Sequence, residues 1–345
     1  MKISIGILAY NEERFIESTV ASLMRQTVFA DAETEKEIIL VANGCIDRTA
    51  AVADAALKAA LGAPNLRAEV LELAEPGKAN AWNVFIHEAS AKDTDYFVLL
   101  DADIEFERDD ALSRLIQHLE EKPEIEIAPD QPVKKFGSKG FFAVLIRAMQ
   151  KTGSDGDTAL SGQLYAARAN TLRSIVLPRG LVVEDGFLRA MTLTGSFTHP
   201  EERARICRAP AVRHFYAPYE SLSGVYRYER RQAAGTAINR LVYREIQRWR
   251  KDGLDPAAEI ARRNEQDPGW LEGVIAKGVA EGDAIPRNYV FRRLRRRDNW
   301  SLKRLHKLPL IAAATLFDLV VAIDATKELR NRSAGVRWDT IRETA

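Results

Sequence analysis

The stretch FVLLDADIEF at residues 97–106 joins a buried-strand pattern to two closely spaced aspartates. Four consecutive apolar residues, at positions 97–100, are typical of a strand inside a sheet. Asp101 and Asp103 follow at once, although buried carboxylates are costly without partners. Side chains alternate along a strand, but both aspartates can converge where the strand ends and the chain turns. The stretch therefore predicts a buried strand that brings two carboxylates to one edge of a sheet.

Three more apolar runs in the first half end in polar clusters in the same way. They predict strands at residues 3–9, 37–42 and 68–73, and helical patterns alternate with the strands at 15–24, 48–61, 79–89 and 111–121. Such alternation predicts an α/β fold, a mostly parallel sheet flanked by helices. Ligands of these sheets gather at the carboxyl ends of strands. The clusters AYNEE, NGCIDRT, EPGKANAWN and DAD therefore predict one shared site. Each cluster alone would also suit a capped loop.

The second half is less regular. Residues 161–169 read as a strand entering a helix, and residues 182–191 as a loop entering a helix. An extended segment is expected within 205–215, a helix over 220–250, and an interrupted helical region over 252–283.

The charge of the chain is unevenly distributed. Its net charge is +1, but residues 285–307 hold nine Lys/Arg and one Asp, a charge of +8, which leaves −7 elsewhere. This basic block suggests an anionic partner, although no nucleic-acid module is recognisable and we expect no nucleic-acid partner. The two cysteines have no metal-type spacing, and residues 1–10 do not read as a signal peptide. A cytoplasmic protein is therefore expected.

The acidic pair at the sheet edge has two interpretations. Mg²⁺ and Mn²⁺ prefer oxygen ligands and bind substrate phosphates at the same time, so Asp101 and Asp103 suit a metal–diphosphate complex. The alternative is a solvated turn that caps a helix.

Six motifs together resemble the series found in family-2 glycosyltransferases with the nucleotide-diphospho-sugar (GT-A) fold. They are AYNEE, VANGCIDRTA, EPGKANAWN, LLDADI, SGQLYAAR and VVEDGFL. The resemblance covers about residues 1–250, with a nucleotide-binding half at 1–105 and an acceptor half at 106–250. It leaves 251–345 as a helical C-terminal region. It implies a hexosyltransferase that uses Mn²⁺ or Mg²⁺ and transfers a sugar, with inversion, most often from a UDP-sugar.

The resemblance also implies roles on the nucleotide side. The loop for the nucleobase and ribose matches Ala9, Tyr10, Asn11 and Glu12. Asn43 stands where many relatives have an aspartate that contacts the base, so UDP is favoured but the base is less determined. Gly77 and Lys78 match a pair near the nucleotide. Asp101, Ala102 and Asp103 match the DxD motif, in which Asp103 would bind the metal directly and Asp101 the ribose and a metal-bound water. Ser161 and Gly162 match the segment under the donor sugar.

On the acceptor side, Glu184 and Asp185 match the family's ED pair, whose aspartate is the general base. A carboxylate positioned opposite the leaving group suits that role. Both are alternatively first-turn acids favoured by the helix dipole. His214 matches a late histidine that some relatives use as a third metal ligand, although a lone histidine is more often structural. Roughly where relatives carry the QxxRW motif that contacts diphosphate, this chain has Arg227, Arg230 and Arg231 instead. The absence of the motif favours transfer of a single sugar.

The apolar segment at 308–324 follows the basic block. It is short for a spanning helix and contains Asp318. The remaining interpretations are a core or dimer-interface helix, with a homo-oligomer in the second case, or a helix lying on anionic lipid. The last would place the enzyme on the inner face of a membrane. There it would act on a glycan or lipid-linked acceptor in cell-envelope polysaccharide or glycolipid synthesis.

Two other functions compete with glycosyl transfer. A sugar-nucleotide nucleotidyltransferase would carry a glycine-rich, arginine-bearing loop after the first strand, and AYNEERF has no glycine. A catalytically inactive GT-A scaffold or binding protein would be expected to lose the DxD or ED carboxylates, and both pairs are present.

Overall fold

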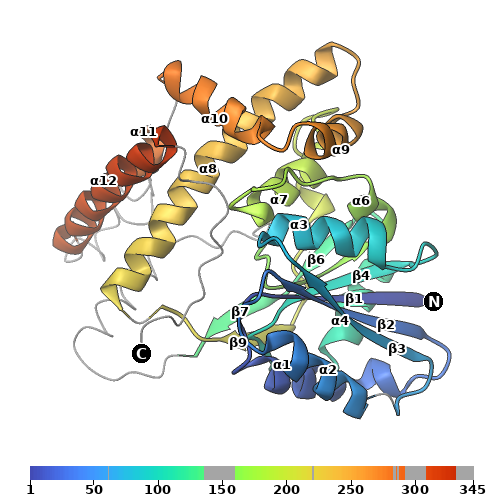
Figure 1. The fold of residues 1–345 in the computed structure, drawn as a ribbon. Coiled ribbons are helices and arrows are strands. Elements are labelled where there is room, and N and C mark those ends of the chain that lie inside the picture. Colours follow the sequence, from blue (N-terminus) through green and yellow to red (C-terminus); the bar gives the residue numbers. More distant parts are fainter. Residues whose placement is uncertain are drawn as a thin grey trace.

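The computed structural model describes residues 1–60, 62–135, 160–219, 221–282, 285, 287–291 and 308–331. Six strands form the main sheet in the order β3-β2-β1-β4-β8-β6 (Figure 1). They are β1 (Lys2–Ala9), β2 (Glu35–Asn43), β3 (Leu66–Leu73), β4 (Tyr96–Asp101), β6 (Ile127–Pro129) and β8 (Leu164–Arg168). Strands β1 to β4 are parallel, whereas β8 runs antiparallel to β4 and β6 antiparallel to β8. The predicted mostly parallel α/β sheet is confirmed.

The central strands are buried on both faces, which explains their continuous apolar runs. Alternate residues enter opposite hydrophobic clusters: Phe97 and Leu99 of β4 enter one, Val98 and Leu100 the other. In β1, Gly6 leaves room for the ring of Phe85, because an ideal Cβ on this glycine would lie 2.6 Å from Phe85 Cε1. Period-two alternation therefore places helices on both faces.

Helices cover the two faces in separate groups (Figure 1). One face carries α1 (Ile16–Met24), the 3₁₀ turn η1 (Thr27–Ala30), α2 (Thr49–Ala60) and α4 (Ala111–Glu121). The other carries α3 (Lys78–Asn83), the π-helical turn η2 (Val84–Ala89), α6 (Ala169–Arg173) and α7 (Glu184–Thr194). The helix predicted at 79–89 is thus an α-helix continued by a π turn. Of the extended segment predicted within 205–215, the part from residue 213 onward forms a strand.

A second sheet lies beyond the end of β4. Its strands, in the order β5-β9-β7, are β5 (Glu105–Phe106), β9 (Arg213–Tyr216) and β7 (Gln131–Lys134). A 3₁₀ turn, η3 (Arg203–Arg205), precedes β9. This small sheet forms part of the wall of the candidate site.

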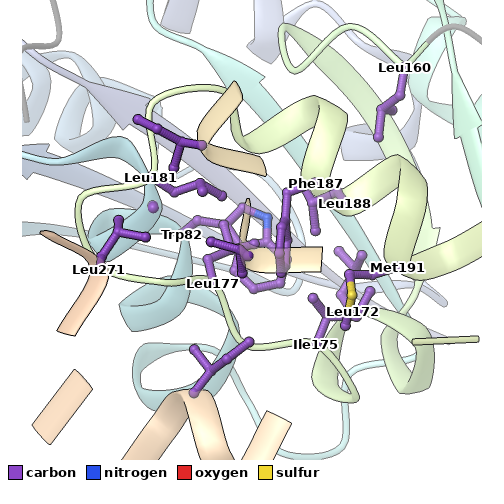
Figure 2. Packing of buried hydrophobic residues seen from close by; sticks show 14 of the residues in the cluster. Trp82, Leu160, Leu172, Ile175, Leu177, Leu181, Phe187, Leu188, Met191 and Leu271 are labelled. Carbon is purple, nitrogen blue, oxygen red and sulfur yellow. The ribbon is translucent and has the colours of Figure 1, made fainter. Parts of the chain in front are cut away.

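The C-terminal helices pack around α8 (Leu222–Lys251), the long diagonal helix of Figure 1. They are α9 (Pro256–Gln266), α10 (Trp270–Ala280), α11 (Arg287–Val290) and α12 (Leu308–Arg330). Leu271 of α10 joins the cluster around Trp82, Leu177 and Phe187 (Figure 2), and Val321 of α12 belongs to the same cluster. The core therefore continues across the boundary predicted at residue 250, and that boundary stays a prediction.

Helix α12 is longer than the predicted segment 308–324, and the other described residues cover one of its faces. Ala314, Val321 and Ala325 are buried on the side that packs against α8. Leu316 and Leu319 lie on the exposed side. Within the described residues, no helix is both long enough and apolar enough to cross a membrane. Positions 292–307 of the basic block lie outside the described residues.

Candidate active site

A cavity of about 350 Å³ lies at the carboxyl ends of β1 and β4. The register pairs Leu8 with Asp101, and Ala9 with Ala42, so the ends of β1, β2 and β4 are level. The cavity brings together many of the predicted residues: Tyr10, Glu12, Lys78, Asp101, Ala102, Asp103, Ser161, Gly162, Glu184, Asp185 and Arg231. These residues come from six separate parts of the sequence, so the sheet edge creates the site.

Lys78 joins the two acidic motifs. Its Nζ lies 2.6 Å from Oδ1 of Asp101 and 2.9 Å from Oε1 of Glu184, and it donates to the carbonyl of Gly162 at 3.3 Å. A side chain at Gly162 would crowd this contact, because an ideal Cβ would lie 3.0 Å from Oε1 of Glu184. The amine therefore fixes the first aspartate of the DxD motif relative to the ED pair.

Burial and charge set the protonation of these groups. Burial alone would lower the pKa of Lys78, but the charges of Asp101 and Glu184 raise it above its ordinary value. Burial opposes ionisation of Glu184, yet Lys78 and then Arg231 hold the pKa of Glu184 below its usual range. For Asp185, burial and the adjacent Glu184 raise the pKa to about 6. The two neighbouring carboxyls thus have pKa values shifted in opposite directions, a pattern typical of acid–base sites.

The cavity as a whole is anionic. Its lining includes the cations Lys78, Lys134 and Arg231 and the carboxylates Glu12, Asp101, Asp103, Glu184, Asp185 and Glu229. Three cations against six ionised carboxylates leave a formal charge of −3. An anionic ligand would therefore meet net repulsion unless a cation entered with it.

Helix α8 holds the turn that carries the ED pair. The Nδ2 of Asn239 donates to the carbonyl of Val183 at 2.8 Å, and the hydroxyl of Tyr243 donates to the carbonyl of Gly186 at 2.9 Å. Gly235 permits the close approach, since a Cβ there would overlap the side chain of Val183. The backbone N–H of Gly186 donates to Oδ1 of Asp185 at 2.7 Å. The first turn of α7 is thus held from both sides.

Several predicted nucleotide-side residues lie outside the cavity lining. Ala9 is fully buried in β1, and Gly77 precedes α3 with a φ of 153°. Asn11 has a φ of 54°, and its Oδ1 accepts from the backbone of Ile46 at 2.9 Å. Asn43 ends β2 with 0% exposure, and within the described residues neither polar atom of its side chain has a hydrogen-bond partner. The nucleotide-binding roles of these four residues stay predictions.

The predicted arginines separate by helical phase. Arg231 lines the cavity, whereas Nε of Arg230 lies 3.1 Å from Oε2 of Glu328 on α12. Arg227 is half-buried on α8 and is not part of the lining. The structure therefore brings one of the three arginines to the carboxylates.

His214 is fully buried on β9, away from the cavity lining. Its Nδ1 lies 2.6 Å from Oδ2 of Asp130. Among the described residues, no group of three or more His, Cys, Asp or Glu side chains has the geometry of a metal site. A metal role for His214 stays a prediction that this placement does not support.

The sequence interpretation missed the part of the wall that comes from β7, β9, the loop after β9 and α8. It comprises Lys134, Tyr216, Pro218, Tyr219, Val225, Tyr228, Glu229 and Gln232. A signal was present, because positions 225, 228, 229 and 232 lie on one face of a helix. Periodicity alone does not tell whether such a face meets a core or a ligand.

Comparisons with known proteins agree with the fold. Residues 4–160 match the model of the family described as glycosyl transferase family 2. No curated protein matches the chain. The solved structure of mannosyltransferase PcManGT from Pyrobaculum calidifontis, in complex with GDP-Man and Mn²⁺, is similar at 18% identity and a TM-score of 0.56. The similarity covers 95% of this chain and 86% of that chain.

Two further structures have lower TM-scores. S. aureus TarS 1–349 is 15% identical at a TM-score of 0.45, with 96% of this chain and 91% of that chain covered. Glucosyl-3-phosphoglycerate synthase from Mycobacterium tuberculosis, with Mg²⁺ and UDP, is 19% identical at 0.47, with 70% and 79% covered. The N-terminal part of the chain thus resembles a glycosyltransferase family, and the fold shared with PcManGT agrees with the predicted α/β fold.

Proposed function

We propose that the protein is a metal-dependent, inverting glycosyltransferase that moves a sugar from a nucleotide sugar to a hydroxyl of a glycan or lipid-linked acceptor. One observation carries the proposal. A single cavity holds the acidic pair Asp101 and Asp103, the bridging Lys78, and the carboxyl of Asp185, whose pKa is raised to about 6. A nucleotidyltransferase or an inactive scaffold has no evident need for that last carboxyl.

The residues present fit a divalent metal. Asp101 and Asp103 offer hard oxygen ligands, and Mg²⁺ is commonly held by one or two carboxylates together with substrate phosphates. A cavity with a formal charge of −3 would admit a nucleoside diphosphate more readily with a divalent cation. Asp103 would contact the metal directly, while Asp101, already paired with Lys78, would bind the ribose and a metal-bound water. When bound, the metal neutralises charge that develops on the departing diphosphate.

The transfer step assigns the proton to Asp185. The acceptor hydroxyl gives its proton to this carboxylate as its oxygen bonds to the anomeric carbon on the face opposite the diphosphate. The bond between that carbon and the phosphate oxygen breaks, and the nucleoside diphosphate leaves with the electron pair. A general base works best when its pKa lies near the working pH, as a value of about 6 allows. Glu184 stays paired with Lys78, and Arg231, which lines the cavity, would stabilise the diphosphate.

The donor is proposed to be a UDP-sugar, with GDP-mannose as the second candidate because the PcManGT structure contains GDP-Man and Mn²⁺. Calorimetric titration of UDP and of GDP, each with Mn²⁺ and with excess EDTA, tests the site. We expect one nucleotide to bind only with Mn²⁺, and Asp103→Ala to weaken that binding at least about tenfold. Asp109→Ala removes an exposed carboxylate outside the cavity and serves as the matched control. Tight metal-free binding, or unchanged binding by Asp103→Ala, would contradict the proposal.

We also propose that the enzyme docks on the cytoplasmic face of an anionic membrane. The exposed side of α12 carries Leu316, Leu319, Val320 and Ile323, which are 63%, 42%, 46% and 48% exposed. Nine Lys/Arg within residues 285–307 immediately precede this helix and complement anionic lipid. Such docking would suit a lipid-linked acceptor. A second copy of the chain on the same helix face is the competing outcome, and sedimentation of the lipid-free protein would reveal it.

A further inference from the structure

Three tyrosines form an aromatic wall of the cavity. Tyr216 ends β9, Tyr219 lies in the loop that follows, and Tyr228 lies in the second turn of α8. Pro218 and Val225 line the cavity beside them. The antiparallel pairing of Glu105 with Phe215 brings Tyr216 close to the DxD residues, whereas Tyr219 and Tyr228 pack together at the start of α8. None of these three tyrosines is assigned to the donor in the function proposed above.

The rings are held in place rather than loosely exposed. The Tyr219 and Tyr228 ring centroids are 5.5 Å apart, with an angle of 41° between the planes. Gly224 lets Tyr219 pack on the first turn of α8, since an ideal Cβ there would lie 2.9 Å from Tyr219 Cδ1. Tyr228 remains 41% exposed, a large fraction for a side chain that lines a cavity. The arrangement presents a preformed aromatic surface to a ligand.

This surface lies close to the proposed base. Although 41% of Tyr228 is exposed, its surroundings raise the pKa of its phenol, by desolvation first and then by the charge of Asp185. The phenol is therefore within electrostatic reach of that carboxylate. Tyr228 and Asp185 line the same cavity, so a ligand that packs on Tyr228 lies near Asp185.

The chemistry of the wall selects among acceptors. A sugar ring has an apolar C–H face, which packs on aromatic rings, and hydroxyls at its edge, which need hydrogen-bond partners. Gln232 and Glu229 lie on the same face of α8 as Tyr228 and can supply such partners. The charged groups that act on Tyr228 are Asp185, Glu229 and Arg231, so a phosphate group here would meet two carboxylates and one guanidinium.

We propose that Tyr216, Tyr219 and Tyr228 form the acceptor subsite and that it takes a neutral sugar ring with one hydroxyl directed at Asp185. This inference rests on the proposed function, because it names the acceptor class of the same site. The reacting group is then a sugar hydroxyl rather than a lipid phosphate.

The test measures sugar and nucleotide binding separately. Labelled protein is applied, with Mn²⁺ and UDP or GDP, to an array of immobilised neutral mono- to tetrasaccharides in both anomeric forms. Farnesyl phosphate is the competing probe for a lipid phosphate. Tyr228→Ala removes the ring, and Tyr228→Phe keeps it without the hydroxyl. Leu222→Ala changes an exposed side chain of α8 outside the cavity and is the matched control. Calorimetry follows nucleotide binding in each variant.

We expect at least one glycan to bind, and binding to fall about tenfold or more in Tyr228→Ala while Tyr228→Phe and Leu222→Ala retain it. Nucleotide binding should stay within about twofold in all variants. Three results would overturn the inference: no neutral glycan binds, Tyr228→Ala binds it as wild type does, or farnesyl phosphate displaces it. Wild-type protein that binds glycan but no nucleotide would refute glycosyl transfer and leave the sugar site standing.

Discussion

Replacing Asp185 by asparagine should stabilise the fold while it removes the proposed activity. The carboxyl is held in a buried site beside Glu184, and both causes raise its pKa from the usual 3.8 to about 6. Because the folded protein binds this proton more tightly than the unfolded chain does, ionisation costs stability as the pH rises through that interval. Asparagine carries no charge, and its Oδ1 can still accept the N–H of Gly186.

The magnitude follows from the shift. About 2 pKa units correspond to about 3 kcal/mol at pH values above 6, which is the upper limit of the gain. An unfolding entropy of about 2.1 cal/mol/K per residue over 345 residues converts this to about 4 °C in Tm. At about pH 4.5 the folded protein keeps the proton, so the gain should shrink to about 1 kcal/mol. Loss of a general base should lower kcat by about 10² to 10⁴.

The neighbouring carboxylate provides a control of opposite sign. Burial alone would raise the pKa of Glu184, but Lys78 and Arg231 lower it overall, so its ionised form stabilises the fold. The stabilisation by ionised Glu184 is fully present above the pKa that this carboxyl has in the unfolded chain. It is lost as the pH falls through the lower pKa of the same carboxyl in the folded protein. Glu184→Gln should therefore lower Tm at about pH 8, where Asp185→Asn raises it. Differential scanning fluorimetry at about pH 8 and pH 4.5 measures both. A rise in both variants, or a gain for Asp185→Asn that does not depend on pH, would refute the reasoning.

Three further predictions concern the surroundings of the site. Tyr243→Phe removes the hydrogen bond to the carbonyl of Gly186 but keeps the ring. It should lower kcat with nucleotide affinity unchanged and cost about 1 kcal/mol of stability, and a loss of affinity alone would contradict this. Lys78→Met leaves two carboxylates without their cation and should cost about 3–5 kcal/mol, measured by urea unfolding; wild-type stability would show that the pairs are unimportant. Leu316→Gln combined with Leu319→Gln should reduce flotation on phosphatidylglycerol vesicles, and equal flotation would argue against docking through α12.

The fold was predictable because its signals are local. Each parallel strand is a short apolar run followed by a polar cluster, and the sheet places the ends of neighbouring strands level. Leu8 pairs with Asp101 in the register, so the loops that begin at Tyr10 and Ala102 must meet. Six motifs in order then indicated the family, although no one motif would have been sufficient.

The contacts within the site were less predictable, because they depend on helix phase and on tertiary approach. Arg230 and Arg231 are neighbours in sequence, yet one meets Glu328 and the other the cavity. Lys78 was expected near the base or phosphate, and its link between the two acidic motifs requires residues from two distant segments. For α12, both faces are apolar, so periodicity could not decide which side packs against α8.

The charge of the cavity explains why a buried lysine is needed. Two carboxylates that share a small volume repel each other by several kcal/mol at an effective dielectric constant of about 20. Lys78, 2.6 Å from Asp101 and 2.9 Å from Glu184, offsets one such repulsion. Asp103 and Asp185 line the same cavity. In the proposed reaction these two carboxylates contact the metal and the acceptor proton. Lys78 therefore stabilises the fold at the place where the carboxylates of the active site cluster.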